Sequence, residues 1–237
     1  MRLLVCLPHA GSGPALFRHW PARFTPDMRI LAPRLPGRED RFLEDTHATI
    51  DKAVSSLLQE IADSARLARD VTIFGHCLGA VLGYELARRW NEIAAPPIGR
   101  LIVSAAHPPD RPLGIAVDHL DDEALLRTME RMTGYQDPML ADAEMRDILM
   151  PAIRGDLTMH ERYAVESDQP LAVPITCVRG RSDRFVSQDD VMGWQKYSHA
   201  SVEFVELPGN HMYVLDRPDA LFALLARPAP SGRGPCC

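Results

Sequence analysis

Five consecutive residues, Gly75-His76-Cys77-Leu78-Gly79, constrain the fold of this chain more than any other segment. An apolar run at 71–74 precedes them, and residues 80–87 carry apolar side chains at helical spacing. The pattern is Gly-x-Ser-x-Gly with cysteine in place of serine, which is typical of a strand that turns sharply into a helix and exposes a nucleophile. The flanking glycines allow such a turn without a clash from a Cβ atom. The segment therefore predicts an α/β fold and makes Cys77 a candidate nucleophile.

Apolar segments alternate with amphipathic ones along most of the chain. A helix should follow the turn, and the other expected helices cover 48–67, 188–197 and 216–226. The expected strands cover 2–7, 28–32, 71–74, 100–104, 174–179 and 202–207. This alternation predicts a mostly parallel sheet with helices on both faces. Catalytic groups should then lie at the carboxyl ends of the strands.

The alternation stops between about 110 and 168, where we expect helices at 121–133 and 141–150 and no strand. We interpret this segment as an insertion over the sheet edge of a single domain that covers residues 1–227. Six of the ten methionines fall between Met129 and Met159. Flexible apolar side chains of this kind either pack the insertion onto the body or line an adaptable acyl pocket under a mobile lid, and the two alternatives are compatible. Residues 228–237 have the composition of a disordered tail.

Composition excludes several classes of partner. The formal net charge is −6 and no basic block stands out, so nucleic acid is not expected to bind. Apolar runs are far shorter than the roughly 18 residues of a membrane span. The first apolar stretch stops at Pro8, too early for a signal peptide. We therefore expect a cytoplasmic monomer that does not enter a membrane.

The five cysteines do not form a metal-binding pattern. No Cys-x-x-Cys pair or His-rich spacing suggests zinc, so we expect neither a metal nor another cofactor. Cys6 and Cys177 lie in apolar strand-like runs and are expected to be small core residues. The terminal pair, Cys236 and Cys237, is expected to have no function.

A cysteine nucleophile needs a base and an acid that orients the base. In folds with this turn the chain order is nucleophile, acid, histidine. Asp183 follows the strand at 174–179 and is the candidate acid, although a solvated loop charge between Arg181 and Arg184 is the alternative. The candidate base is His211, which follows the last strand and precedes the last helix. Five other histidines lack this combination of positions: His9, His76, His107, His160 and His199.

The reaction also needs an oxyanion hole made of two N–H groups. Leu78 should supply one N–H directly after the nucleophile, and the loop after the first strand should supply the other. Ala10, within the loop at 8–13, is our candidate for the second donor. A plain glycine-rich turn is the alternative. A phosphate-binding loop is disfavoured because no Lys-Ser/Thr pair follows the glycines.

Together these residues resemble the type II thioesterases of polyketide and nonribosomal peptide assembly lines, which have an α/β-hydrolase fold with a helical lid. The resemblance covers about residues 3–225. Its specific segments are Leu7-Pro8-His9-Ala10-Gly11, Arg34-Leu35-Pro36-Gly37-Arg38-Glu39, Leu149-Met150-Pro151-Ala152-Ile153-Arg154-Gly155-Asp156 and Pro208-Gly209-Asn210-His211. Four such segments in the right order are much more specific than one pentapeptide.

The resemblance implies action on acyl groups carried as thioesters on the phosphopantetheine arm of an acyl or peptidyl carrier protein. It implies a triad of Cys77, His211 and Asp183, and hydrolysis of stalled or mis-primed chains or release of a product. In thioesterase domains fused to synthases, the acid commonly follows the strand after the nucleophile. Here that strand ends at Val103-Ser104-Ala105 without a carboxylate, which favours the free-standing type.

The departure from the family is Cys77, because the family uses serine. A thiol ionises more readily than a hydroxyl, and a thioester acyl-enzyme would stay activated. That chemistry favours acyl transfer or ring closure, as in Dieckmann-type or lactam-forming release, as the alternative to hydrolysis. An inactive protein that binds carrier proteins or acyl ligands is a second alternative. For docking to an acidic carrier protein, Arg34, Arg38 and Arg41 are candidates, with an ordinary charged loop as the alternative.

Overall fold

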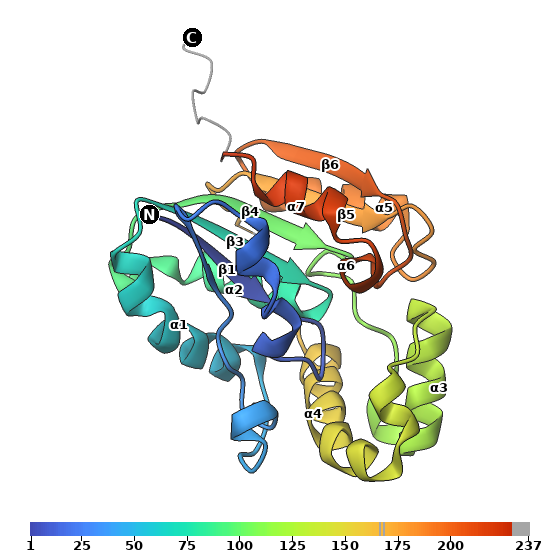
Figure 1. Cartoon of the computed structure of the whole chain (residues 1–237). Coiled ribbons are helices and arrows are strands. Elements are labelled where there is room, and N and C mark those ends of the chain that lie inside the picture. The colour runs from blue at the N-terminus through green and yellow to red at the C-terminus, as the bar shows by residue number, and fades with distance from the viewer. Residues whose placement is uncertain (166, 168, 229–237) are drawn as a thin grey trace.

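A single parallel sheet lies at the centre of the chain (Figure 1). The computed structural model describes residues 1–165, 167 and 169–228, so the expected tail lies almost entirely outside the described residues. The strand order is β2-β1-β3-β4-β5-β6, and all neighbours are parallel. The strands are β1 (Arg2–Leu7), β2 (Met28–Leu31), β3 (Asp70–His76), β4 (Ile98–Ser104), β5 (Ile175–Gly180) and β6 (Val202–Leu207). All six expected strands are confirmed.

The strand order places a switch point between β1 and β3. The chain passes from β1 outward to β2, and then returns to the other side of β1 to form β3. Loops at the carboxyl ends of such strands diverge and leave room for a ligand. The loop at 8–13 follows β1 and Cys77 follows β3, so both lie at this position.

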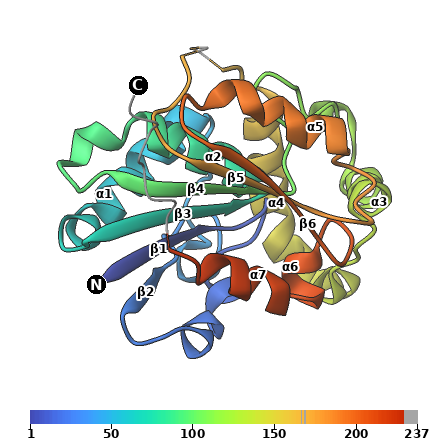
Figure 2. The same cartoon turned by 90° about the horizontal axis from the view of Figure 1, so that it is seen from above.

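Each face of the sheet packs against its own layer of helices. Along β1, Leu3 and Val5 enter one hydrophobic core, whereas Leu4 and Cys6 enter the other. This alternation follows from the two-residue period of a strand that is buried on both faces. Figure 2 shows α2 and α5 on one side of the sheet and α7 on the other. The helices of the body are α1 (Ile50–Arg66), α2 (Leu78–Arg88), α5 (Gln188–Met192), α6 (Tyr213–Asp216) and α7 (Asp219–Leu225).

The helices expected from the sequence are confirmed with local differences. The helix expected at 188–197 is α5 followed by a 3-10 segment, Gly193–Tyr197. The helix expected at 216–226 is α7, which begins later, after Pro218, and the short helix α6 that precedes it was not expected. Neither difference moves a helix to another face of the sheet.

The insertion between β4 and β5 contains α3 (Asp122–Thr133) and α4 (Ala143–Glu161). The expected end of the second helix at 150 was wrong, because α4 continues through Pro151. Proline inside a helix costs about 3 kcal/mol. Beyond it, Ile153, Asp156 and Leu157 are all buried, and these tertiary contacts offset that cost.

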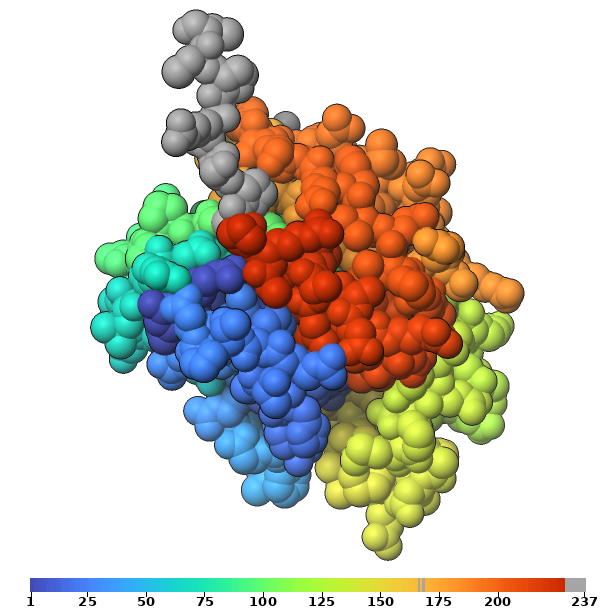
Figure 3. Space-filling view, turned by 45° about the horizontal axis from the view of Figure 1, so that its top comes forward, coloured from blue at the N-terminus to red at the C-terminus, as the bar shows by residue number. Residues whose placement is uncertain are grey.

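The insertion forms a lobe at one end of the molecule, beside the loop that precedes α1 (Figure 3). Met150 and Met159 are buried in it, and Met129 and Met132 pack against the main core, while Met139 is exposed. Packing of the insertion onto the body is therefore observed for part of the methionine set. Among the described residues, no helix is long and apolar enough to cross a membrane. Cys6 and Cys177 are buried, as expected.

Candidate active site

The turn between β3 and α2 holds Cys77 in a strained backbone conformation. Its φ is 54° and its ψ is −117°, outside the regions that residues with a Cβ atom prefer. A Cβ on Gly75 would lie 2.0 Å from the Gly79 carbonyl oxygen, and one on Gly79 would lie 2.2 Å from the Leu7 carbonyl oxygen. Only glycine fits at these two positions. The tight packing, with the 2.8 Å bond from Cys77 N–H to Ser104 O, keeps Cys77 in place.

His211 and Asp183 are brought together at the carboxyl ends of β6 and β5. His211 Nδ1 lies 2.9 Å from Asp183 Oδ2, and both side chains are buried. The other oxygen, Asp183 Oδ1, accepts bonds from the N–H groups of Phe185 and Val186 at 2.9 and 3.0 Å. These two backbone bonds fix the carboxylate, which in turn orients the imidazole. Asp183 is therefore not the solvated loop charge that the sequence left open.

Electrostatics favour the charged forms of this pair. Burial works against ionisation of Asp183, but hydrogen bonds from His211 and the backbone lower the pKa of Asp183 below its ordinary value. Burial alone would lower the pKa of His211, but Asp183 and Cys77 outweigh it and raise this pKa to about 10. His211 Nε2 is buried and has no hydrogen-bond partner of good geometry among the described residues. This ring nitrogen thus has no competing partner and can interact with Cys77.

A second histidine, His76, packs beside His211 with ring centroids 5.5 Å apart. Its Nδ1 lies 2.8 Å from Ser104 Oγ, which also forms a hydrogen bond with the Tyr213 hydroxyl. Burial, with smaller effects of His211 and His9, holds the pKa of His76 well below its ordinary value. His76 is therefore a neutral packing residue.

The two candidate oxyanion donors lie on segments that meet at the turn. Leu78 is the first residue of α2, where helical N–H groups lack intrahelical acceptors. The 8–13 loop adjoins the same turn, since a Cβ on Gly79 would also lie 2.6 Å from Pro8 O. In the described part of the chain, neither the Ala10 N–H nor the Leu78 N–H donates a hydrogen bond to any group. Both donors are free for a ligand.

Two buried residues near this loop were not assigned to the site from the sequence. Asp156 of α4 accepts a bond from Gly11 N–H at 2.8 Å, and Arg38 pairs with Asp156. Both residues lie in segments that carry the family resemblance, and this resemblance was the sequence feature that could have pointed to them. The expectation that Arg38 serves as a docking residue was wrong, because its side chain is only 4% exposed. Arg34 and Arg41 remain accessible, but acidic neighbours already pair with each.

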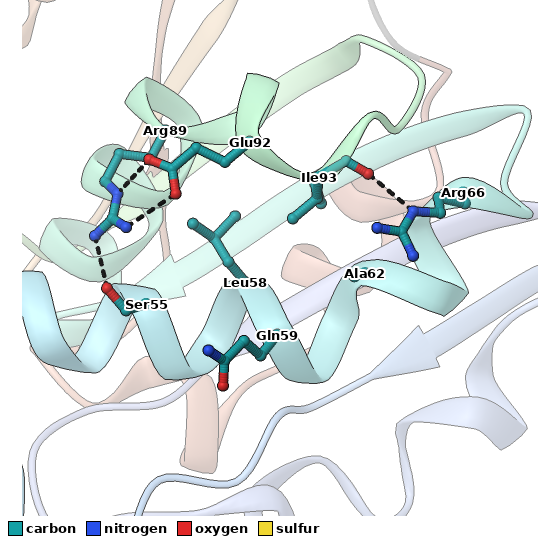
Figure 4. Close-up of a pocket in the computed structure, with 8 residues that line it drawn as sticks. All are labelled: Ser55, Leu58, Gln59, Ala62, Arg66, Arg89, Glu92 and Ile93. Carbon is teal, nitrogen blue, oxygen red and sulfur yellow. Dashed lines mark hydrogen bonds and ion pairs between the residues drawn. The ribbon is translucent and has the colours of Figure 1, made fainter.

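A surface hollow lies elsewhere, between α1 and residues 89–93 (Figure 4). Its charged groups already have partners: Arg89 forms hydrogen bonds with Ser55 and Glu92, and Arg66 donates one to the Ile93 carbonyl. None of the predicted site residues lines it. We therefore place the functional site at the carboxyl ends of the strands.

Comparisons with known proteins show which family the chain is similar to. A family model described as "Thioesterase domain" matches residues 2–227. The gramicidin S biosynthesis protein GrsT of Aneurinibacillus migulanus is 28% identical over 214 residues, covering 90% of this chain and 83% of GrsT. The RedJ thioesterase from the prodiginine pathway of Streptomyces coelicolor has a TM-score of 0.86 at 31% identity, covering 95% of this chain and 84% of RedJ.

Another solved structure, the type II thioesterase BorB from the borrelidin biosynthetic cluster, has a TM-score of 0.84 at 31% identity. The matched region covers 95% of this chain and 91% of BorB. With the six-stranded parallel sheet, these neighbours confirm the α/β-hydrolase fold expected from the sequence.

Proposed function

The chain belongs to the thioesterase domain family, and we propose that it is a free-standing type II thioesterase of polyketide or nonribosomal peptide biosynthesis. Its substrates are acyl groups carried as thioesters on the phosphopantetheine arm of a carrier protein. Its nucleophile is Cys77, where members of this family usually have serine. The observation that carries the proposal is the position of His211. Asp183 holds its Nδ1, and no described residue competes with Cys77 for its buried Nε2. Cys77 lies near enough to raise the pKa of His211.

In the first half-reaction, the Cys77 sulfur attacks the thioester carbonyl carbon as a thiolate, while its proton is held on His211 Nε2, as the raised pKa of His211 requires. The carbonyl oxygen becomes an oxyanion, which the N–H groups of Ala10 and Leu78 stabilise. Collapse of this intermediate breaks the bond to the pantetheine sulfur, which leaves with the proton from His211. The product is an acyl group on Cys77. Throughout, Asp183 stabilises the imidazolium form of His211.

In the second half-reaction, water gives a proton to His211 Nε2 as its oxygen attacks the acyl-Cys77 carbonyl carbon. The same two N–H groups stabilise the second oxyanion. The carbon–sulfur bond breaks, the carboxylic acid leaves, and the Cys77 thiolate is again paired with the protonated His211. The acyl-enzyme is itself a thioester, so acyl transfer from pantetheine exchanges one thioester for another of similar energy.

Cys77 also supports a second candidate function, thioester-dependent ring closure. A thioester intermediate remains open to amine or carbon nucleophiles within the acyl chain. Hydrolysis is the first candidate because the surrounding segments resemble type II thioesterases.

Product analysis separates the two functions. The purified protein is incubated with simple acyl-pantetheine thioesters and, separately, with a carrier protein that carries an acyl group on its phosphopantetheine arm. The Cys77→Ala variant is the control. Hydrolysis predicts free acid from both substrates and none above background from the variant. No release from simple thioesters, combined with a cyclic product from an elaborated β-ketoacyl or aminoacyl thioester, would reject the hydrolytic proposal.

A further inference from the structure

The buried ion pair between Arg38 and Asp156 joins three segments that are distant in sequence. Arg38 Nη1 lies 2.5 Å from Asp156 Oδ2, and Nη2 lies 2.7 Å from Oδ1, so the pair is bidentate. Arg38 also donates to the carbonyls of Pro36 and Ser12. Desolvation makes a buried ion pair weak evidence of stabilisation by itself. Its position therefore suggests another role.

That role concerns the 8–13 loop, where hydrogen bonds restrain the peptide groups around Ala10. Asp156 Oδ2 accepts from Gly11 N–H at 2.8 Å, while the Ala10 carbonyl lies 3.0 Å from His9 Nδ1. The His9 carbonyl accepts from Ser12 N–H at 3.2 Å. The Ala10 N–H is left without an acceptor among the described residues. Its direction is thus fixed by the groups on either side.

Asp156 reaches this loop because α4 packs very closely on it. A Cβ on Gly11 would lie 2.3 Å from Ile153 Cγ1, and Gly11 has a φ of +76° that favours glycine. On the other side of α4, a Cβ on Gly155 would lie 2.2 Å from Thr46 Oγ1. The helix α4 is therefore packed between two loops, and the carboxylate of its Asp156 restrains the peptide group that follows Ala10.

We propose that Asp156 is a positioning residue for the oxyanion hole, and that Arg38 compensates its buried charge. This inference rests on the proposed function. The insertion helix α4 thereby does more than cover the site, because it holds the loop that presents the Ala10 N–H. An oxyanion donor acts mainly in the transition state, so its displacement lowers kcat more than it raises KM.

Two double variants test the proposal. Arg38→Met/Asp156→Leu replaces the ion pair by apolar side chains of similar size, a change that buried pairs often tolerate. Arg38→Met/Asp156→Asn also removes the charges but keeps an acceptor for Gly11 N–H. We expect the Leu variant to lose about 10- to 100-fold in kcat, since complete loss of one oxyanion donor costs about 10²- to 10³-fold. The Asn variant should keep most of its kcat, and KM should change little in both.

Arg154→Met is the matched control on α4. It removes the hydrogen bonds from Arg154 to Asp122 and to the Val117 carbonyl without touching the loop, so kcat should stay near the wild-type value. If a double variant does not fold, Asp156→Glu keeps the charge but displaces the carboxylate, and should lower kcat. Equal kcat losses in the Leu and Asn variants, an effect confined to KM, or wild-type kcat in Asp156→Glu and the Leu variant would overturn the inference. Failure of the wild-type protein to hydrolyse thioesters would instead reject the proposed function.

Discussion

At the residue scale, the unusual feature is a cysteine held in a conformation that costs about 1–3 kcal/mol for a residue with a Cβ atom. The φ of 54° at Cys77 is retained because close packing around Gly75 and Gly79 leaves the backbone no alternative. Strain of this kind is common at catalytic turns, where it exposes the nucleophile.

Substitution of Cys77 separates the roles of thiol and geometry. Cys77→Ala should lower kcat/KM by at least about 10³-fold without loss of folded structure, since a catalytic nucleophile is removed. Cys77→Ser should keep measurable hydrolysis, because a hydroxyl can use the same base. Steady-state kinetics and circular dichroism check both variants. Hydrolysis by Cys77→Ala at the wild-type rate would contradict a nucleophilic role.

The protonation of His211 provides a second residue-scale prediction. Because its pKa is raised to about 10, the imidazole should carry its extra proton at neutral pH and lose it only as the pH rises through about 10. Asp183→Asn removes the negative partner, so deprotonation should move to lower pH and kcat should fall by about 10⁴-fold. NMR titration of the histidine rings measures the shift, with His211→Gln to assign the signal. A wild-type His211 that titrates near its ordinary pKa of 6.5 would contradict this account.

At the element scale, the close approach of α2 to β3 and β1 depends on two glycines. Gly75→Ala should destabilise the protein by about 2–4 kcal/mol, since the added Cβ meets backbone atoms that cannot move aside. Gly83→Ala in α2 is the matched control, because its Cβ would meet side-chain atoms at 3.1 Å and beyond. Urea denaturation measures the free energy of unfolding of both variants and of the wild-type protein. Equal loss of stability in both variants would show that packing at the turn is not specially tight.

At this scale, the sequence predicted the features that are determined by residues adjacent in the chain, and missed those that depend on contacts between distant residues. The strands, the turn at Cys77 and the positions of Asp183 and His211 after strand ends could all be read from neighbouring residues. The pairing of Arg38 with Asp156 spans 118 residues, and each is equally consistent with a solvated charge when considered alone. The length of α4 was missed for the same reason, since tertiary contacts stabilise the helix beyond Pro151.

At the scale of the whole molecule, the two helices of the insertion, α3 and α4, differ in how extensively they pack against the rest of the protein. In α3 only Leu125 is buried, whereas α4 has six buried residues and the ion pair to Arg38. Local opening requires little free energy where few apolar contacts are lost. Amides of α3 should therefore exchange hydrogen for deuterium faster than those of α4 beyond Pro151, as measured by mass spectrometry. Equal protection of the two helices would contradict this difference.

The central claim, that Cys77 carries the acyl group during turnover, is tested most directly by intact-protein mass spectrometry of the quenched reaction with an acyl-pantetheine thioester. Peptide mapping locates the adduct and distinguishes Cys77 from the terminal cysteines. We predict one acyl adduct on Cys77 that forms before free acid appears and decays as the acid accumulates. Turnover without an adduct on Cys77, or with an adduct only at another residue, would contradict the account.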